Sequence, residues 1–129
     1  MKNKDKNASE KTFKQYVGDK GETAAVKALE DKGFKIIRRN YAVHNVGEID
    51  IIAEKDNDIY ICEVRTRLNL GAYPDSVESV KGAKKKKVMK TAKFFVDREG
   101  LYDRNIVFEI IKVTSDEQGN ILAVEFVPF

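Results

Sequence analysis

The sequence has little of several residue types: a single cysteine, a single histidine, two prolines and no tryptophan. One cysteine, Cys62, excludes an intramolecular disulfide, and a lone thiol is typical of a reducing compartment. No apolar run approaches the roughly 20 residues that cross a bilayer. The polar, lysine-rich start of the chain lacks the apolar stretch of a signal peptide. These absences predict a cytoplasmic protein with no membrane contact.

The sequence motifs of several common enzyme classes are also missing. There is no P-loop, no Rossmann glycine pattern and no zinc-ligand spacing. The histidine, His44, falls in a predicted loop, where such a residue is more often solvated than a ligand. Any catalytic chemistry is therefore expected from carboxylates and cationic side chains.

The composition is that of one globular domain with a heavily charged surface. The chain has 129 residues, of which 42% are hydrophobic and 35% are charged, a length that fits one domain. It has neither an internal repeat nor a linker rich in proline, glycine or serine. We expect residues 1–11 to be a flexible tail and residues 12–129 to form a single domain.

Apolar periodicity predicts two helices and five strands in the order α-β-β-β-α-β-β. Gly18 and Gly21 weaken the middle of the first helix, which we expect to be kinked or to start late. Helices on both sides of a strand cluster favour an α/β fold in which a mixed sheet is flanked by helices. The predicted helices are Thr12 to Lys32 and Asp75 to Arg98, and the predicted strands are Phe34 to Arg39, Ile49 to Glu54, Ile59 to Thr66, Ile106 to Thr114 and Ile121 to Val127.

The hairpin formed by the second and third strands carries the strongest chemical signal. With a turn at Lys55 to Asp58, the numbers of facing residues sum to 113, so Asp50 faces Glu63 and Glu48 faces Arg65. Facing side chains lie about 4.5–5.5 Å apart, and two carboxylates at that distance repel each other unless a cation joins them. Mg²⁺ is commonly held by one or two carboxylates. The alternative is a solvent-facing side of the sheet that carries ordinary charges.

Cys62 lies on the other, apolar side of the same strand. We expect it to be buried and therefore inert as a nucleophile.

Lysines crowd the second helix although the net charge is only +3. A lysine cluster without acids is the pattern expected of a surface that binds phosphate backbones, although a merely solvated helix face has the same composition. Lys84 differs from the others because it lies on the apolar stripe of Val88, Ala92 and Phe95. It must extend to solvent or point at something anionic. The cluster consists of Lys81, Lys84, Lys85, Lys86, Lys87, Lys90 and Lys93.

Four motifs together resemble the YraN family of predicted endonuclease-like bacterial proteins. They occur in the order and spacing of that family, and the resemblance continues to about Ile111. It implies the restriction-endonuclease-like fold of the PD-(D/E)XK superfamily. The motifs are Gly18-x-x-Gly21-Glu22-x-x-Ala25, Arg39-Asn40-Tyr41, Gly47-Glu48-Ile49-Asp50 and Glu63-Val64-Arg65-Thr66-Arg67.

The resemblance also implies a set of functional residues. The catalytic set would be Glu22, Asp50, Glu63 and Arg65, and the metal, Mg²⁺ or Mn²⁺, would be held by Asp50 and Glu63 with Glu48. The expected activity is hydrolysis of phosphodiester bonds in DNA, with branched and single-stranded forms as candidate substrates. The expected nucleic-acid contacts are Lys84, Lys85, Lys86, Lys90 and Arg67.

Arg65 departs from the superfamily pattern, which has lysine at this position. Arginine stays protonated, so Arg65 cannot act as a base, although it can still stabilise charge on a phosphate. Two alternatives remain open at this point. One is a nucleic-acid-binding module without catalytic activity on the same scaffold, and the other is a protein-interaction adaptor. Glu22 could likewise be an ordinary acid on a helix surface.

Overall fold

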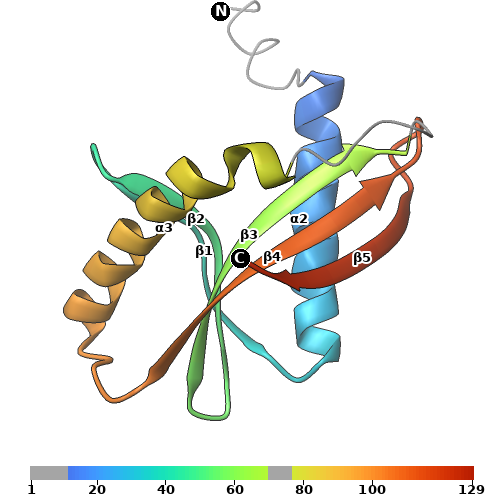
Figure 1. The fold of residues 1–129 in the computed structure, drawn as a ribbon. Coiled ribbons are helices and arrows are strands. Elements are labelled where there is room, and N and C mark those ends of the chain that lie inside the picture. The colour runs from blue at the N-terminus through green and yellow to red at the C-terminus, as the bar shows by residue number, and fades with distance from the viewer. Residues whose placement is uncertain (1–11, 70–76) are drawn as a thin grey trace, which may run out of the picture.

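A computed structural model describes residues 12–69 and 77–129 and confirms the predicted order of elements (Figure 1). The expected tail over residues 1–11 and the expected helix start at Asp75 lie outside the described residues. The helices are α2 (Phe13–Asp31) and α3 (Val77–Glu99), and the strands are β1 (Lys35–Val43), β2 (Gly47–Lys55), β3 (Asp58–Leu68), β4 (Asn105–Ser115) and β5 (Ile121–Pro128).

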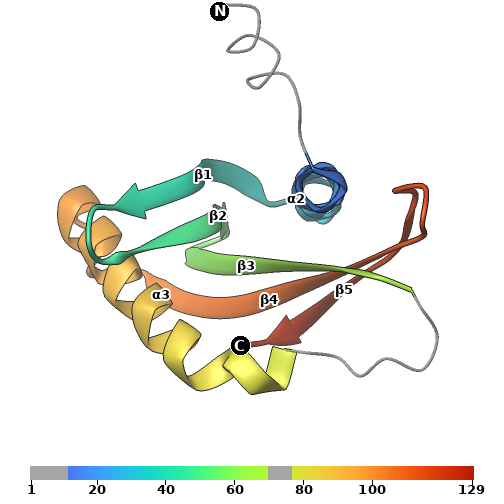
Figure 2. The ribbon, with the colours of Figure 1, turned by 90° about the horizontal axis from the view of Figure 1, so that it is seen from above.

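The strands form one mixed sheet in the order β1-β2-β3-β4-β5. All neighbouring strands are antiparallel except β3 and β4, which are parallel. Parallel neighbours need a crossover, and α3 provides it on one face of the sheet while α2 covers the other (Figure 2). The predicted mixed sheet between helices is therefore confirmed.

Alternation of side chains along β3 divides the interior into two cores. Ile59 and Ile61 pack toward α3, against Phe95 and its neighbours. Cys62 and Val64 pack toward α2, against Leu29 and its neighbours. Cys62 is fully buried, as predicted, and burial raises the pKa of its thiol to about 12. A thiol that stays protonated is not a nucleophile.

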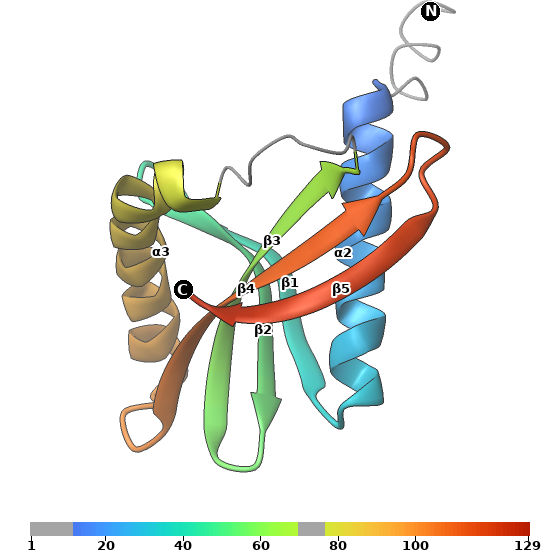
Figure 3. The same cartoon turned by 45° about the vertical axis from the view of Figure 1, so that its right-hand side comes forward.

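At the end of the hairpin away from its turn, β2 and β3 separate, and we call this point the fork (Figure 3). The predicted register holds from Lys55–Asp58 to Ile51–Cys62, where the β2–β3 ladder ends. Beyond that pair β2 continues beside β1, and β3 continues beside β4 as far as Leu68. The predictions that Asp50 pairs directly with Glu63, and Glu48 with Arg65, are therefore wrong as ladder pairs, because the two strands have already separated there.

Two motif glycines allow helices to lie close to strands around this fork. A Cβ atom on Gly21 of α2 would lie 1.9 Å from Thr66 Oγ1 on β3. A Cβ atom on Gly47 of β2 would lie 2.6 Å from Thr91 Oγ1 on α3. The expectation that Gly18 and Gly21 kink or delay the first helix is wrong, because α2 runs unbroken from a capping box at Thr12. Close packing on β3 explains why glycine stands at position 21.

We predict that Gly21→Ala destabilises the protein by about 1–3 kcal/mol, the usual cost of forcing extra atoms into a packed contact. Gly18→Ala is the matched control, because a Cβ atom there meets nothing within 4 Å. Replacing glycine by alanine inside a helix should stabilise the control variant by about 0.5–1 kcal/mol. Urea denaturation of both variants measures the two effects, and equal stabilisation by both would contradict the tight contact with Thr66.

Candidate active site

Asp50 lies at the first position of β2 beyond the last β2–β3 pair, where its side chain makes the contact that the ladder no longer makes. Its Oδ2 accepts a hydrogen bond of 2.8 Å from the backbone N–H of Val64 on β3. On the β1 side, the ladder pairs Arg39 with Ile51 and Tyr41 with Ile49, but it does not pair Asn40 with Asp50. Asn40 has a left-handed backbone conformation, with a φ of 52°. The fork therefore fixes the Asp50 carboxylate between the two separating strands.

Glu63 lies at the corresponding position of β3, and its side chain is only 2% exposed. Two cations approach its Oε2: Lys84 Nζ at 3.3 Å and Arg65 Nη1 at 4.0 Å. Both contacts are ion pairs, and within the described part of the chain the buried Oε2 receives no hydrogen bond of regular geometry. The stripe position of Lys84 is thus explained, because its side chain points at a buried carboxylate.

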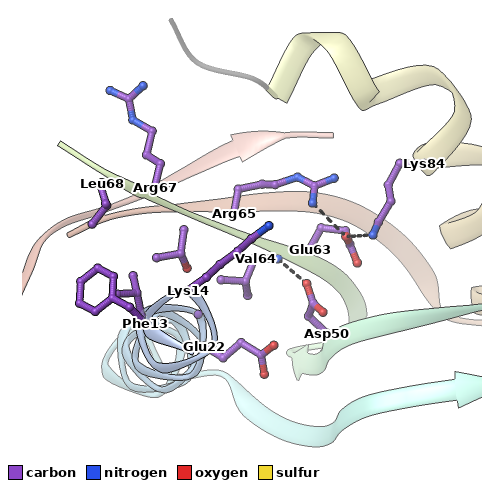
Figure 4. Close-up of a pocket in the computed structure, with 13 residues that line it drawn as sticks. Phe13, Lys14, Glu22, Asp50, Glu63, Val64, Arg65, Arg67, Leu68 and Lys84 are labelled. Atoms are coloured by element: carbon purple, nitrogen blue, oxygen red, sulfur yellow. Dashed lines mark hydrogen bonds and ion pairs between the residues drawn. The ribbon is translucent and has the colours of Figure 1, made fainter. Parts of the chain in front are cut away.

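These groups share one open pocket of about 560 Å³ (Figure 4). Asp50, Glu63, Arg65 and Lys84 line it together with Glu22 of α2. The predicted convergence of Asp50, Glu63 and Arg65 is therefore found, although it arises at the fork and not within a regular ladder.

Burial dominates the electrostatics of the two acids, and the charge of Asp50 adds to it at Glu63. Burial, and next the Asp50 carboxylate, raise the pKa of Glu63 to about 7 against the opposing effect of Lys84 and Arg65. Burial also raises the pKa of Asp50, although the Val64 N–H and the two cations oppose it. Buried carboxylates with shifted pKa values in a pocket are characteristic of functional sites.

Glu22 of α2 lines the pocket on the side of Asp50 (Figure 4). Burial, and next the Asp50 carboxylate, raise its pKa, while Arg39 of β1 lowers it. Arg39 Nη2 lies 3.6 Å from Glu22 Oε1. We did not predict this ion pair, although Arg39 belongs to one of the motifs that signalled the family.

Among the described residues, no third acid joins Asp50 and Glu63 as a metal ligand. Glu48 is exposed and is not among the residues that line the pocket, so its expected place beside Asp50 and Glu63 is wrong. It lies further along β2, where the strand has moved away from β3. Across residues 12–69 and 77–129, no three histidine, cysteine, aspartate or glutamate side chains come together as a metal-binding group.

The predicted nucleic-acid residues do not form one surface. Lys84 and Arg67 line the pocket. Lys85 instead donates a hydrogen bond of 3.0 Å to the backbone carbonyl of Phe129 and is half-buried. Lys86 and Lys90 are exposed, and helical spacing places them on the side of α3 opposite the buried Val88.

Comparison with known proteins identifies the family. The model of the family described as "Uncharacterised protein family UPF0102" matches residues 21–113, which include the two acids together with Glu22, Arg65 and Lys84. The chain belongs to the UPF0102 family. The expected resemblance to the YraN family, which is the same family, is thereby confirmed.

Relatives of this UPF0102 chain share most of its length. A UPF0102 protein of Clostridioides difficile is 40% identical over 97 residues, which cover 74% of this chain and 82% of the relative. One from Dictyoglomus turgidum is 37% identical over 112 residues, which cover 87% and 93%.

Among solved structures, an fdxN element excision controlling factor protein from Anabaena variabilis is similar at 14% identity. The match covers 82% of this chain and 98% of the other, with a TM-score of 0.37. In the described part of the UPF0102 chain, neither helix is long and apolar enough to span a membrane.

Proposed function

We propose that this UPF0102 protein is a metal-dependent nuclease that hydrolyses phosphodiester bonds in DNA, including branched or single-stranded DNA. The observation that carries the proposal is the buried Glu63 carboxylate beside Asp50, with Lys84 and Arg65 converging on it in an open pocket. Two acids and two cations around one cavity suit a substrate that carries negative charge and a cofactor that carries positive charge.

A divalent cation fits the two carboxylates on chemical grounds. Burial raises the pKa of both, and the Asp50 carboxylate raises that of Glu63 further, so a cation held between them would favour the ionised form of each. Oε2 of Glu63 has ion pairs with Lys84 and Arg65 but no hydrogen bond of regular geometry from the described residues, and it is a hard oxygen ligand. Mg²⁺ is usually held by one or two carboxylates, with water and phosphate oxygens completing its shell, so a third acid is not required. Mn²⁺ accepts the same oxygen ligands.

The chain's own residues then have distinct tasks. Asp50, held by the Val64 N–H, and Glu63 would hold the cation, which would supply electrophilic activation of the phosphodiester and of water. Lys84 and Arg65 would lie beside the scissile phosphate and stabilise the charge that develops on it. Arg65 remains protonated and cannot take a proton from water, so its contribution is electrostatic.

A panel of DNA substrates tests the proposal. Single-stranded, duplex, flapped and four-way-junction DNA are incubated with the purified protein in Mg²⁺, in Mn²⁺ and in EDTA. We expect cleavage of at least one substrate with either cation and none in EDTA. Salt-dependent binding without cleavage would instead identify a non-catalytic nucleic-acid-binding module, and the absence of both would leave a protein-interaction role.

We also predict that Lys86 and Lys90 hold the DNA backbone from the outer side of α3. Replacing both by glutamine should weaken binding and reduce the slope of log affinity against log salt by about 2, because each phosphate contact contributes about 0.9. Lys27 and Lys35, exposed lysines on α2 and β1 outside the pocket, give the matched double variant. If both double variants show the same slope as the wild type, the α3 lysines serve only as a solvated surface.

A further inference from the structure

The pocket extends beyond the acids to a second, apolar end. From the fork it runs along β3 to the first turns of α2, where Phe13, Val17 and Leu68 line it (Figure 4). Lys14 and Arg67 line the same end. Phe13 is 48% exposed, although it is a large apolar residue. None of these residues takes part in the chemistry assigned to the acids.

We infer that this end of the pocket holds an unpaired nucleotide of the DNA, with its base against the Phe13 ring and its phosphate near Lys14 and Arg67. The inference rests on the proposed function, because it names the part of the substrate that lies next to the scissile phosphate. It assigns Phe13 as a residue that makes the protein prefer single-stranded segments.

The position of β3 explains how a single strand reaches both ends of the pocket. Within the described residues, β2 leaves β3 after the Ile51–Cys62 pair. Residues from both faces of β3 therefore line one continuous channel, from Glu63 at one end to Leu68 at the other. Arg65 and Arg67 lie two residues apart on this strand, so they point to the same side. A backbone that follows β3 away from the acids passes both cations in turn.

An aromatic ring beside cations suits a base more than any other part of DNA. A base offers a flat π-face to an aromatic side chain, and stacking of this kind tolerates any sequence. A paired base inside a duplex is already stacked on both faces, so only an unpaired base can reach Phe13 without the cost of leaving the stack.

Exposure alone does not single out Phe13. Phe94 on α3 is 50% exposed but lies outside this pocket. Tyr16, which is 45% exposed, already has Lys20 Nζ 5.4 Å from its ring centre. Among the residues that the structure describes, only Phe13 combines an exposed ring with a position in the channel that leads to the acids, and Phe94 therefore serves as the matched control.

The absence of tryptophan from the sequence allows a direct test of the stacked base. F13W and F94W each introduce a single fluorescent reporter at an equally exposed aromatic position. Both are titrated in EDTA with a single-stranded oligothymidine and with a blunt duplex of the same length. We expect saturable quenching of F13W by the single strand, weaker quenching by the duplex and no response of F94W. Equal responses of the two variants, or stronger quenching of F13W by the duplex, would overturn the inference.

A kinetic comparison separates this inference from the proposed function. On a single-stranded substrate, F13A should raise KM by about 5- to 150-fold, the range expected for one stacked base, with kcat little changed. F13Y should restore the wild-type KM, and F94A should leave it unchanged. Cleavage that needs Asp50 but is indifferent to F13A would overturn the subsite and leave the nuclease in place. Quenching of F13W by a protein that cleaves nothing would support the subsite and refute the nuclease.

Discussion

Asp50→Asn is expected to abolish cleavage while leaving the fold intact. The amide oxygen of asparagine can still accept the hydrogen bond from the Val64 N–H, so the link across the fork survives. The negative charge that would hold a cation is lost. The removal of one preorganised electrostatic group typically costs about 10²–10³ in rate, and we expect at least this loss in single-turnover cleavage.

Asp50→Ala provides the structural comparison. It removes the acceptor as well as the charge, and a buried N–H left without a partner costs about 1–3 kcal/mol. The alanine variant should therefore be inactive and less stable, whereas the asparagine variant should be inactive and of nearly wild-type stability. Thermal unfolding measures the difference between the two.

Asp58→Asn is the matched control for the asparagine variant. Asp58 also accepts a side-chain hydrogen bond, from Asn105 Nδ2 at 3.0 Å, on the same hairpin but outside the pocket. The Asp58→Asn variant should cleave DNA at the wild-type rate. Wild-type cleavage by Asp50→Asn would refute the role of this carboxylate, and the search for the catalytic acid would then move to Glu22.

Local sequence signals were sufficient to predict the hairpin but not the fork. The polar turn between two β-branched runs fixes the register, and that register holds as far as Ile51–Cys62. Nothing in either strand marks the point at which β2 turns away to follow β1. That point depends on how two cores and α3 pack against the strands, which is a tertiary effect. The register of the hairpin therefore predicted that Asp50 and Glu63 lie close together, although the β2–β3 ladder ends one position before them.

The charged partners of the acids were predictable to different degrees. A lysine on an otherwise apolar helix stripe needs an anionic partner, so Lys84 could be singled out from spacing alone. The contact of Lys85 with the Phe129 carbonyl joins residues 44 positions apart, and no helical pattern reports it. The same holds for Arg39 and Glu22, which meet only because α2 lies beside β1.

The sequence alone does not indicate a functional role for Phe13. At the start of a helix, an aromatic residue is expected to pack on the sheet or to be exposed without consequence. Its significance comes from the end of β3, which brings Leu68 and Arg67 to the same cavity. The family motifs identify the acids, whereas the shape around them comes from where β2 and β3 separate.

Glu63→Gln is expected to stabilise the metal-free protein at high pH while it removes activity. Burial raises the pKa of Glu63 from 4.5 to about 7, so the folded state holds its proton more tightly than the unfolded chain. The stability contributed by this group is fully present below about pH 4.5 and is lost as the pH rises through 7. Each pKa unit corresponds to about 1.4 kcal/mol, so the loss is at most about 3 kcal/mol. Glutamine keeps the shape without the titration.

The measurement is the free energy of unfolding in urea, with EDTA, between pH 5 and pH 8.5. Relative to its value at pH 5, the Glu63→Gln variant should lose less stability toward high pH than the wild type. Glu30→Gln, at an exposed position on α2, should follow the wild-type profile. If the unfolding free energies of the wild type and Glu63→Gln changed in parallel with pH, burial would not raise the pKa of Glu63.

Adding Mg²⁺ at pH 8 completes the test, because a ligand that binds only the folded state stabilises it by about 2.7 kcal/mol at 100 times its dissociation constant. The wild-type protein should gain thermal stability with Mg²⁺, since both carboxylates are then ionised and their repulsion is relieved. Glu63→Gln and Asp50→Asn should gain none, because each leaves a single carboxylate at the fork. If Mg²⁺ raised the unfolding temperature of all three proteins equally, the cation would bind elsewhere. Glu63 would then not be a metal ligand, although its burial lowers the stability of the protein at high pH.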